Sequence, residues 1–179
     1  DGRAAAELSE RLKVLEAEGF VFEAADASLE LLMRQAAGWT QDFFSIESYR
    51  VSSYHREGAV AVGALDLSTE ATVKVWIGSG DDAERIAAVG EGNGPVNALD
   101  AALRAALTER FGVIAGIHLI DFKVRILDTS ASTDAVTRVL IDSTDGERTW
   151  TTIGVSANII EASWMALIDS FVYGLLHAP

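Results

Sequence analysis

The sequence predicts an α+β fold built from two pseudo-symmetric units, each with three antiparallel strands backed by one helix. The first observation is an internal repeat: residues 71–103 and 135–167 align without a gap at a shift of 64 and share nine of 33 residues. The second is that alternating apolar residues are followed in both copies by an apolar stripe at helical spacing. We therefore expect a duplicated βββα domain. The alternative is two stretches that share a common pattern without duplication.

The identities of the repeat fall on predicted strands, turns and helices alike. They pair Ala71 with Ala135, Val75 with Val139, Ile77 with Ile141, Ser79 with Ser143, Asp81 with Asp145, Gly90 with Gly154, Ala98 with Ala162, Ala102 with Ala166 and Leu103 with Leu167.

A short helical segment is predicted to precede the two units. Its first helix is expected to end at Gly19. The apolar residues at helical spacing in this helix are Leu8, Leu12 and Leu15. A second helix is expected from about Glu23 to Ala36, before Gly38. Because this pair is too small to fold alone, it should pack on the repeats or on another part of a longer protein. We assign residues 1–40 to a helical linker subdomain and residues 41–179 to a second domain that contains both repeats.

The first repeat, about residues 41–112, should contain three strands and a helix. Residues 44–54 are rich in β-formers, 71–77 alternate apolar and polar residues, and 84–89 follow a turn with two glycines. Pro95 suits the first turn of the helix. The apolar stripe of that helix is Val96, Leu99, Leu103, Ala106, Leu107 and Phe111.

The second repeat, about residues 117–176, follows the same order. Strands are expected at 119–127, 135–141 and 148–155, followed by a helix over 158–175. The buried residues of this helix are expected to be Ile160, Trp164, Leu167, Phe171 and Leu175. The opening strands correspond at a shift of 73, which matches Tyr49-Arg50-Val51 with Phe122-Lys123-Val124.

Composition excludes several classes of function. A net charge of −13 opposes binding to nucleic acid, and the absence of cysteine removes disulfides, thiol nucleophiles and thiolate metal sites. No segment reaches the apolar length expected of a membrane span, and no signal peptide opens the chain. We therefore expect a soluble, cytoplasmic protein without a membrane partner. Because the chain begins at Asp1 rather than at methionine, we expect a fragment of a longer protein, trimming being the alternative.

No catalytic residues and no metal ligands are predicted. His55, His118 and His177 are scattered, without a carboxylate or second histidine at ligand spacing. The serines lack a Gly-x-Ser-x-Gly motif, and the carboxylates are dispersed. The four tryptophans are interpreted as core or interface residues: Trp39, Trp76, Trp150 and Trp164.

The glycine-rich segment Gly90-Glu91-Gly92-Asn93-Gly94-Pro95 lies between a predicted strand and a predicted helix. Its spacing does not fit a dinucleotide fingerprint, and it lacks the Gly-Lys-Ser/Thr of a Walker loop. Two interpretations stay open. The segment is a tight turn, or its glycines allow a close approach to an anion such as a carboxylate at the helix start.

Four segments of the chain resemble one enzyme family. Residues 92–99, 121–125 and 150–163 closely resemble the C-terminal regulatory region of the 2-isopropylmalate synthase and citramalate synthase family. Residues 15–28 resemble the linker subdomain of the citramalate synthase branch. The resemblance covers essentially the whole chain. It implies two βββα units, and it implies that acyl transfer occurs on a metal-binding TIM barrel that is not in this sequence.

The resemblance also implies a homodimer that binds the end-product amino acid near the dimer interface. No cofactor is expected in this chain. A divalent metal is expected on the catalytic barrel of the parent enzyme, and the domain is expected to contact that barrel. The effector-binding residues carried over are Gly94, Val96, Asn97, Leu119, Phe122, Ile126, Ser132, Thr133, Val136, Val155 and Ala157. They combine an apolar wall for a branched side chain with amides and short polar groups for the ammonium and carboxylate.

The sequence is thus interpreted as the allosteric and dimerising fragment of a citramalate synthase-like enzyme, inactive alone, with isoleucine as the favoured effector. The parent would condense acetyl-CoA with pyruvate, or with 2-oxoisovalerate if it belonged to the leucine pathway, with leucine as effector. A ligand-free dimerisation module and a stand-alone enzyme are the alternatives. Large side chains on the nominally polar faces of strands, such as Trp76 and Leu140, are expected to be buried between two chains.

Overall fold

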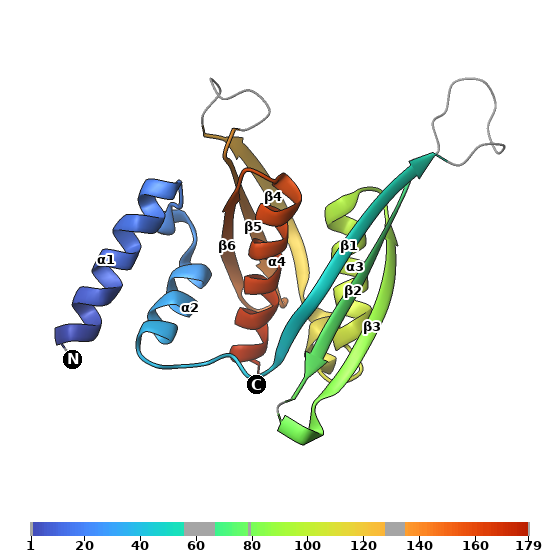
Figure 1. The fold of residues 1–179 in the computed structure, drawn as a ribbon, viewed down its shortest axis with the longest axis horizontal. Coiled ribbons are helices and arrows are strands. Elements are labelled where there is room, and N and C mark those ends of the chain that lie inside the picture. Colours follow the sequence, from blue (N-terminus) through green and yellow to red (C-terminus); the bar gives the residue numbers. More distant parts are fainter. Residues whose placement is uncertain (1, 56–66, 79, 128–134, 179) are drawn as a thin grey trace. The chain divides into compact units, whose positions relative to one another are not determined.

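The computed structural model describes residues 2–55, 67–78, 80–127 and 135–178. It contains two three-stranded antiparallel sheets, each packed against a helix, with further helices at the N-terminus (Figure 1). The predicted α+β class and the duplicated βββα order are confirmed. Two compact units are formed, one by residues 42–115 and the other by residues 1–41 together with 116–179. The N-terminal helices therefore belong with the second repeat.

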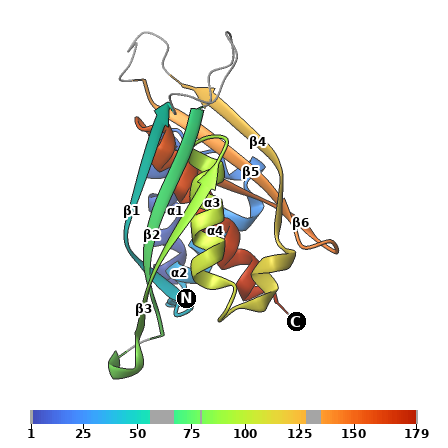
Figure 2. The same ribbon diagram turned by 90° about the vertical axis from the view of Figure 1, so that its right-hand side faces the viewer.

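The unit of residues 42–115 is a sheet covered on one face by α3. Its strands are β1 (Phe44–His55), β2 (Leu67–Ile77) and β3 (Glu84–Gly92), in that order, and α3 spans Pro95–Leu107. A short 3-10 turn, η2 (Gly80–Asp82), lies between β2 and β3, and η3 (Gly112–Gly116) follows α3. Figure 2 shows α3 lying along this sheet. The core residues are Ala71, Val73, Val75 and Ile77 of β2 and Ala98, Leu99, Ala102, Leu103, Ala106 and Leu107 of α3.

The other unit has helices on both faces of its sheet. Strands β4 (His118–Ile126), β5 (Thr137–Thr144) and β6 (Thr149–Ser156) are followed by α4 (Ile159–Leu176), which packs on β5 and β6. The N-terminal elements are α1 (Gly2–Glu18), η1 (Phe22–Ala24) and α2 (Asp26–Ala36). They pack around a cluster of Phe22, Ala25, Leu32 and Ile153 on the face opposite α4, and α2 also contacts α4 beside the edge strand β6. The N-terminal helices thus pack on the second repeat, one of the two partners expected.

Leu140 was expected to be spare apolar surface for a second chain. This expectation is wrong, because Leu140 packs against the cluster beneath the N-terminal helices of its own chain. Trp76, in the other sheet, does remain exposed. Trp76 is more exposed than Leu140 because, among the described residues, helices cover both faces of the second sheet and one face of the first.

Helix α4 corrects the expectation that no segment is long and apolar enough to span a membrane. By length and composition alone, Ile159–Leu176 meets that criterion. More than half of the helix is buried within the structure, and its buried side includes Trp164, Leu167 and Phe171. Such burial is that of a core helix packed on a sheet.

The pairing of the strands corrects the predicted register of the repeat. Val73 pairs with Ala88 in the first sheet and Ile141 with Thr152 in the second. A shift of 64 relates Ala88 to Thr152, so the middle strands correspond at a shift of 68. The expected equivalence of Val75 with Val139 is therefore wrong. The hairpin of the second repeat is four residues shorter between these positions, which a gapless alignment cannot represent.

The opening strands confirm the predicted shift of 73. Tyr49 pairs with Val73, and Phe122 pairs with Ile141, so the two aromatic residues occupy equivalent places. Each opening strand also has an irregular register at an equivalent position, between Ile46 and Ser48 in β1 and between Leu119 and Asp121 in β4.

Candidate functional site

Two of the three glycines in the glycine-rich segment 90–95 serve helix packing. A Cβ atom at Gly90 would lie 2.7 Å from the carbonyl oxygen of Ala98, and one at Gly92 would lie 2.6 Å from the amide nitrogen of the same residue. These distances leave no room for a side chain between β3 and α3. Gly90 and Gly92 therefore allow the strand and helix backbones to approach each other.

Gly94 differs from both of them. A Cβ atom at Gly94 would meet nothing within 4 Å, and its backbone is extended, with φ −174°. Neither packing in this chain nor a left-handed conformation therefore requires glycine at this position. Strand–helix packing accounts for Gly90 and Gly92, which lie in β3 rather than in a tight turn, and leaves Gly94 without a structural reason.

The N-terminus of α3 lacks the cap that α4 has. Asn158 caps α4, since its Oδ1 accepts from the amides of Ile160 at 2.9 Å and Glu161 at 3.4 Å. Gly94 occupies the same position of α3 without a side-chain cap, and the first turn of α3 holds no acidic residue. The positive end of α3 therefore suits an external anion, as proposed for Val96 and Asn97. The Asn97 side chain accepts from the Asn93 amide at 3.2 Å.

Strand β4 exposes apolar side chains on the face that carries α4. The register places Phe122, Val124 and Ile126 on this face, beside the buried Ile141, Val139 and Thr137. We call these three residues the β4 strip. They are 39%, 43% and 54% exposed, because α4 covers β5 and β6 instead. Leu119 lies on the same face and is half-buried. The sequence prediction included Phe122 and Ile126 but missed Val124, although its i+2 spacing from Phe122 places it on the same face.

The other predicted effector contacts do not gather at this strip. Val155 lies on the opposite face of the sheet, where it packs against the cluster under the N-terminal helices. Val136 is half-buried just before β5, and its carbonyl accepts from the Leu127 amide at 2.8 Å. Ala157 is exposed, between β6 and α4. Ser132 and Thr133 lie outside the described residues.

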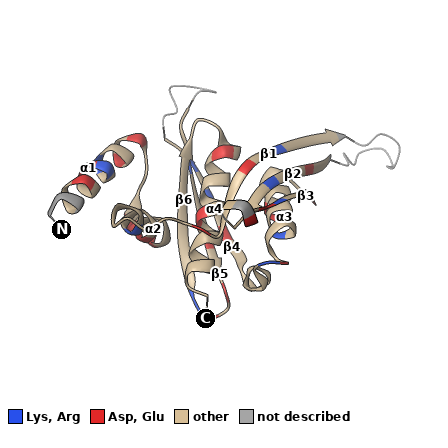
Figure 3. Cartoon of the chain, turned by 60° about the horizontal axis from the view of Figure 1, so that its bottom comes forward, with Lys and Arg blue, Asp and Glu red and all other residues tan. Residues whose placement is uncertain are grey.

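Several titratable side chains form local pairs. Arg85 binds Glu47 through two hydrogen bonds of 2.6 and 2.7 Å, and Lys123 bridges Asp121 and Asp142. The amide of Arg148 and other donors of the β5–β6 hairpin hold the pKa of Asp145 at about 2. Among the residues that the structure describes, no three His, Cys, Asp or Glu side chains form a group able to hold a metal ion. Figure 3 shows acidic and basic residues interspersed over the elements.

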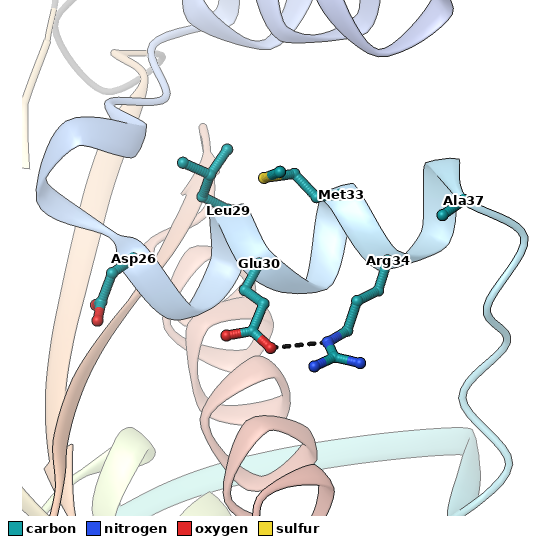
Figure 4. A pocket seen from close by; sticks show the side chains of 6 residues that line it. All are labelled: Asp26, Leu29, Glu30, Met33, Arg34 and Ala37. Atoms are coloured by element: carbon teal, nitrogen blue, oxygen red, sulfur yellow. Dashed lines mark hydrogen bonds and ion pairs between the residues drawn. The ribbon is translucent and has the colours of Figure 1, made fainter. Parts of the chain in front are cut away.

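Among the residues that the structure describes, two surface hollows contain none of the predicted effector contacts. One, of about 430 Å³, lies on α2 (Figure 4) and is lined by Asp26, Leu29, Glu30, Met33, Arg34 and Ala37. The other, of about 220 Å³, lies on the first sheet and is lined by Ser48, Tyr49, Arg50, Thr72 and Lys74. The candidate site features are therefore the uncapped first turn of α3, in the unit of residues 42–115, and the β4 strip, in the other unit.

Comparison with known proteins gives a consistent result. Residues 23–175 match the family described as the LeuA allosteric (dimerisation) domain. The chain is 50% identical over 92% of its length to a Synechocystis protein named (R)-citramalate synthase, and 47% identical over 94% to one from Streptomyces coelicolor. A Sulfolobus acidocaldarius protein of the same name is 35% identical over 93% of the chain. The chain spans about three tenths of the length of these relatives.

Proposed function

Because the chain belongs to the family of LeuA allosteric (dimerisation) domains and is the regulatory domain of a citramalate synthase-like protein, we propose that it binds isoleucine as a feedback inhibitor. The parent enzyme would condense acetyl-CoA with pyruvate. The similarity to proteins named (R)-citramalate synthase over more than nine tenths of this chain carries the proposal. The competing candidate is a leucine-binding domain of a 2-isopropylmalate synthase, and the names of the relatives favour the first.

The chemistry of condensation is assigned to the catalytic part of the parent, with its divalent metal. This chain would act by binding the effector and thereby changing the balance between active and inhibited states of the enzyme. The proposed division of labour predicts that the isolated chain binds the effector without catalysing the reaction.

The effector contacts are assigned by the chemistry of a branched amino acid. The uncapped amides at the start of α3, near Gly94, Val96 and Asn97, suit its carboxylate. From the family resemblance, Phe122 and Ile126 of β4, which are both exposed and apolar, are proposed as contacts of its side chain. We keep Leu119, Val136, Ala157, Ser132 and Thr133 as proposed contacts from the family resemblance. We omit Val155, because its side chain is covered by the N-terminal helices.

Isothermal titration calorimetry on the isolated chain tests this function directly. Isoleucine or leucine is expected to bind and to raise the melting temperature by mass action, whereas glycine and lysine should not bind. Binding of isoleucine more tightly than leucine would support the citramalate assignment. The absence of binding by any branched-chain amino acid at millimolar concentration would instead leave a ligand-free dimerisation module, which the exposed β4 strip would also suit.

Replacing Gly94 by valine is expected to weaken effector binding about tenfold or more, equivalent to about 1.4 kcal/mol. A Cβ atom there meets nothing within 4 Å, so the fold should tolerate a side chain, but that side chain would stand beside the amides proposed to hold the carboxylate. Gly112→Val is the matched control, because a Cβ atom there also meets nothing within 4 Å. Unchanged affinity in a folded Gly94→Val chain would show that the carboxylate binds elsewhere.

The homodimer is proposed to bury the β4 strip. Val124→Lys is expected to raise the dimer dissociation constant at least about a hundredfold, because an unpaired charge in an interface costs several kcal/mol. Val14→Lys is the control, since Val14 is a 51% exposed apolar residue of α1. Sedimentation at tens of micromolar protein should show dimers of the wild type and of Val14→Lys and monomers of Val124→Lys. A monomeric wild type would contradict the proposal outright.

A further inference from the structure

Helix α2 binds the free edge of the second sheet through side chains. Strand β6 is an edge strand, so part of its backbone has no neighbouring strand. Asp26 Oδ1 accepts from the amide of Thr151 at 2.9 Å, and Ser28 Oγ accepts from the amide of Ile153 at 3.1 Å. Two alternate backbone amides of β6 therefore donate hydrogen bonds to side chains from the first turn of α2. An edge without such partners would be open to pairing with another strand.

The same helix is bound to α4. The hydroxyl of Ser28 donates to Asp169 Oδ2 at 2.7 Å, which continues the hydrogen-bond chain from β6 through α2 to α4. Glu30 Oε1 contacts Nε2 of His177, just after α4, at 3.0 Å. Asp26 and Glu30 point to one side of α2, away from Leu29 and Met33 (Figure 4). The polar contacts of α2 with the rest of its unit thus come from three alternate residues, 26, 28 and 30.

Asp169 accepts the hydrogen bond from Ser28, and no ion pair joins its carboxyl group to a cation among the described residues. Burial raises the pKa of Asp169 to about 6, and the bond from Ser28 offsets this only in part. The titratable and charged groups around the contact are Asp26, Glu30 and Arg34 of α2, Tyr173 of α4, Arg148 of the β5–β6 hairpin and His177 beyond α4. Desolvation opposes ionisation of Glu30, but the hydrogen bonds from Arg34 and His177 outweigh it and lower the pKa of Glu30. Glu30 therefore stays ionised while Asp169 takes up a proton near pH 6.

We propose that α2 is a releasable clamp on the edge strand β6, and that proton uptake by Asp169 tightens it. When α2 is released, Asp169 meets water and recovers the ordinary pKa of an aspartate, about 3.9. The protonated carboxyl therefore favours the clamped state. This gain is complete below about pH 4 and is lost as the pH rises to about 6.

The clamp can be followed by cysteine labelling, because the sequence contains no cysteine. In the full chain, Ala27→Cys places a thiol at a completely buried position of α2 that release would expose. Met33→Cys places one at a 50% exposed position of the same helix, and its labelling rate corrects for the effect of pH on thiol reactivity. The ratio of the two rates measures protection by the clamp. We expect about tenfold greater protection at pH 5 than at pH 7.5.

Asp169→Asn should remove most of this pH dependence, since the amide keeps an acceptor for Ser28 but does not titrate. Asp145→Asn, in the β5–β6 hairpin, should leave it intact. Equal protection of the wild type at the two pH values, or an unchanged dependence in Asp169→Asn, would overturn the proposal. Should Ala27→Cys impair folding, protection of the Thr151 and Ile153 amides against hydrogen exchange gives the same comparison. These measurements need no amino acid, so their outcome is independent of the effector assignment.

Discussion

Replacing Gly154 by alanine is expected to destabilise the chain by about 3 kcal/mol or more, at or beyond the upper end of the usual cost of overpacking. The reason is the contact of β6 with α4. A Cβ atom at Gly154 would overlap the carbonyl oxygen of Ala162 and lie 2.8 Å from its carbonyl carbon. Neither a rotamer change nor a shift of a flexible side chain can relieve an overlap with helix backbone. The strand and the helix would have to separate, which would weaken packing along the whole interface.

Denaturant unfolding of Gly154→Ala, Gly90→Ala and Gly94→Ala tests this reasoning within one chain. Gly90 is the equivalent of Gly154 at the shift of 64 and approaches Ala98 and Ala102 of α3, so its replacement should be comparably costly. Gly94→Ala should change stability by about 0.5 kcal/mol or less, because the site is open. A wild-type midpoint for Gly154→Ala would show that the strand and helix can separate at little cost.

These glycines also explain why some identities of the gapless alignment mark structurally equivalent positions and others do not. Gly90 and Gly154, with the alanines facing them, meet the same steric demand in both units, so identical residues mark truly equivalent positions. The middle strand is different, because any β-branched residue fills its buried places. Val139 therefore matched Val75 in a gapless alignment, although the strand pairing makes Val139 the equivalent of Ala71. Apolar alternation identified the strands but could not fix their register.

The candidate site was predictable only where local sequence determines it. The helix start at Gly94 and Pro95 can be read from local rules, and so can the alternation that exposes Phe122 and Ile126 on one face of β4. The position of Val155 could not be read in this way. Its burial depends on the N-terminal helices, more than 100 residues earlier in the sequence, folding over that face. The contacts of Asp26 and Ser28 with β6 have the same long-range origin and left no local signal.

Leu103→Ala is expected to cost about 2 to 5 kcal/mol of stability, the range for removing a large aliphatic side chain from a core. Leu103 is completely buried on α3, which lies against the first sheet, and the neighbouring Leu99 and Leu107 are equally buried. A rigid helix between these neighbours cannot collapse into the space left behind, so the loss should lie well above the low end of that range. Met165→Ala, at an exposed position of α4, should cost about 0.5 kcal/mol or less.

The same variant separates stability from binding. Because Leu103 lies in the core, away from the exposed turn at Gly94, the folded fraction of Leu103→Ala should bind the effector with nearly wild-type affinity. Gly94→Val should do the reverse and lose affinity while keeping its denaturation midpoint. Calorimetry below the midpoint, together with denaturant unfolding, measures both quantities on the same samples. A Leu103→Ala chain that folds but loses binding would mean that effector recognition depends on the packing of α3 rather than on the amides at its first turn.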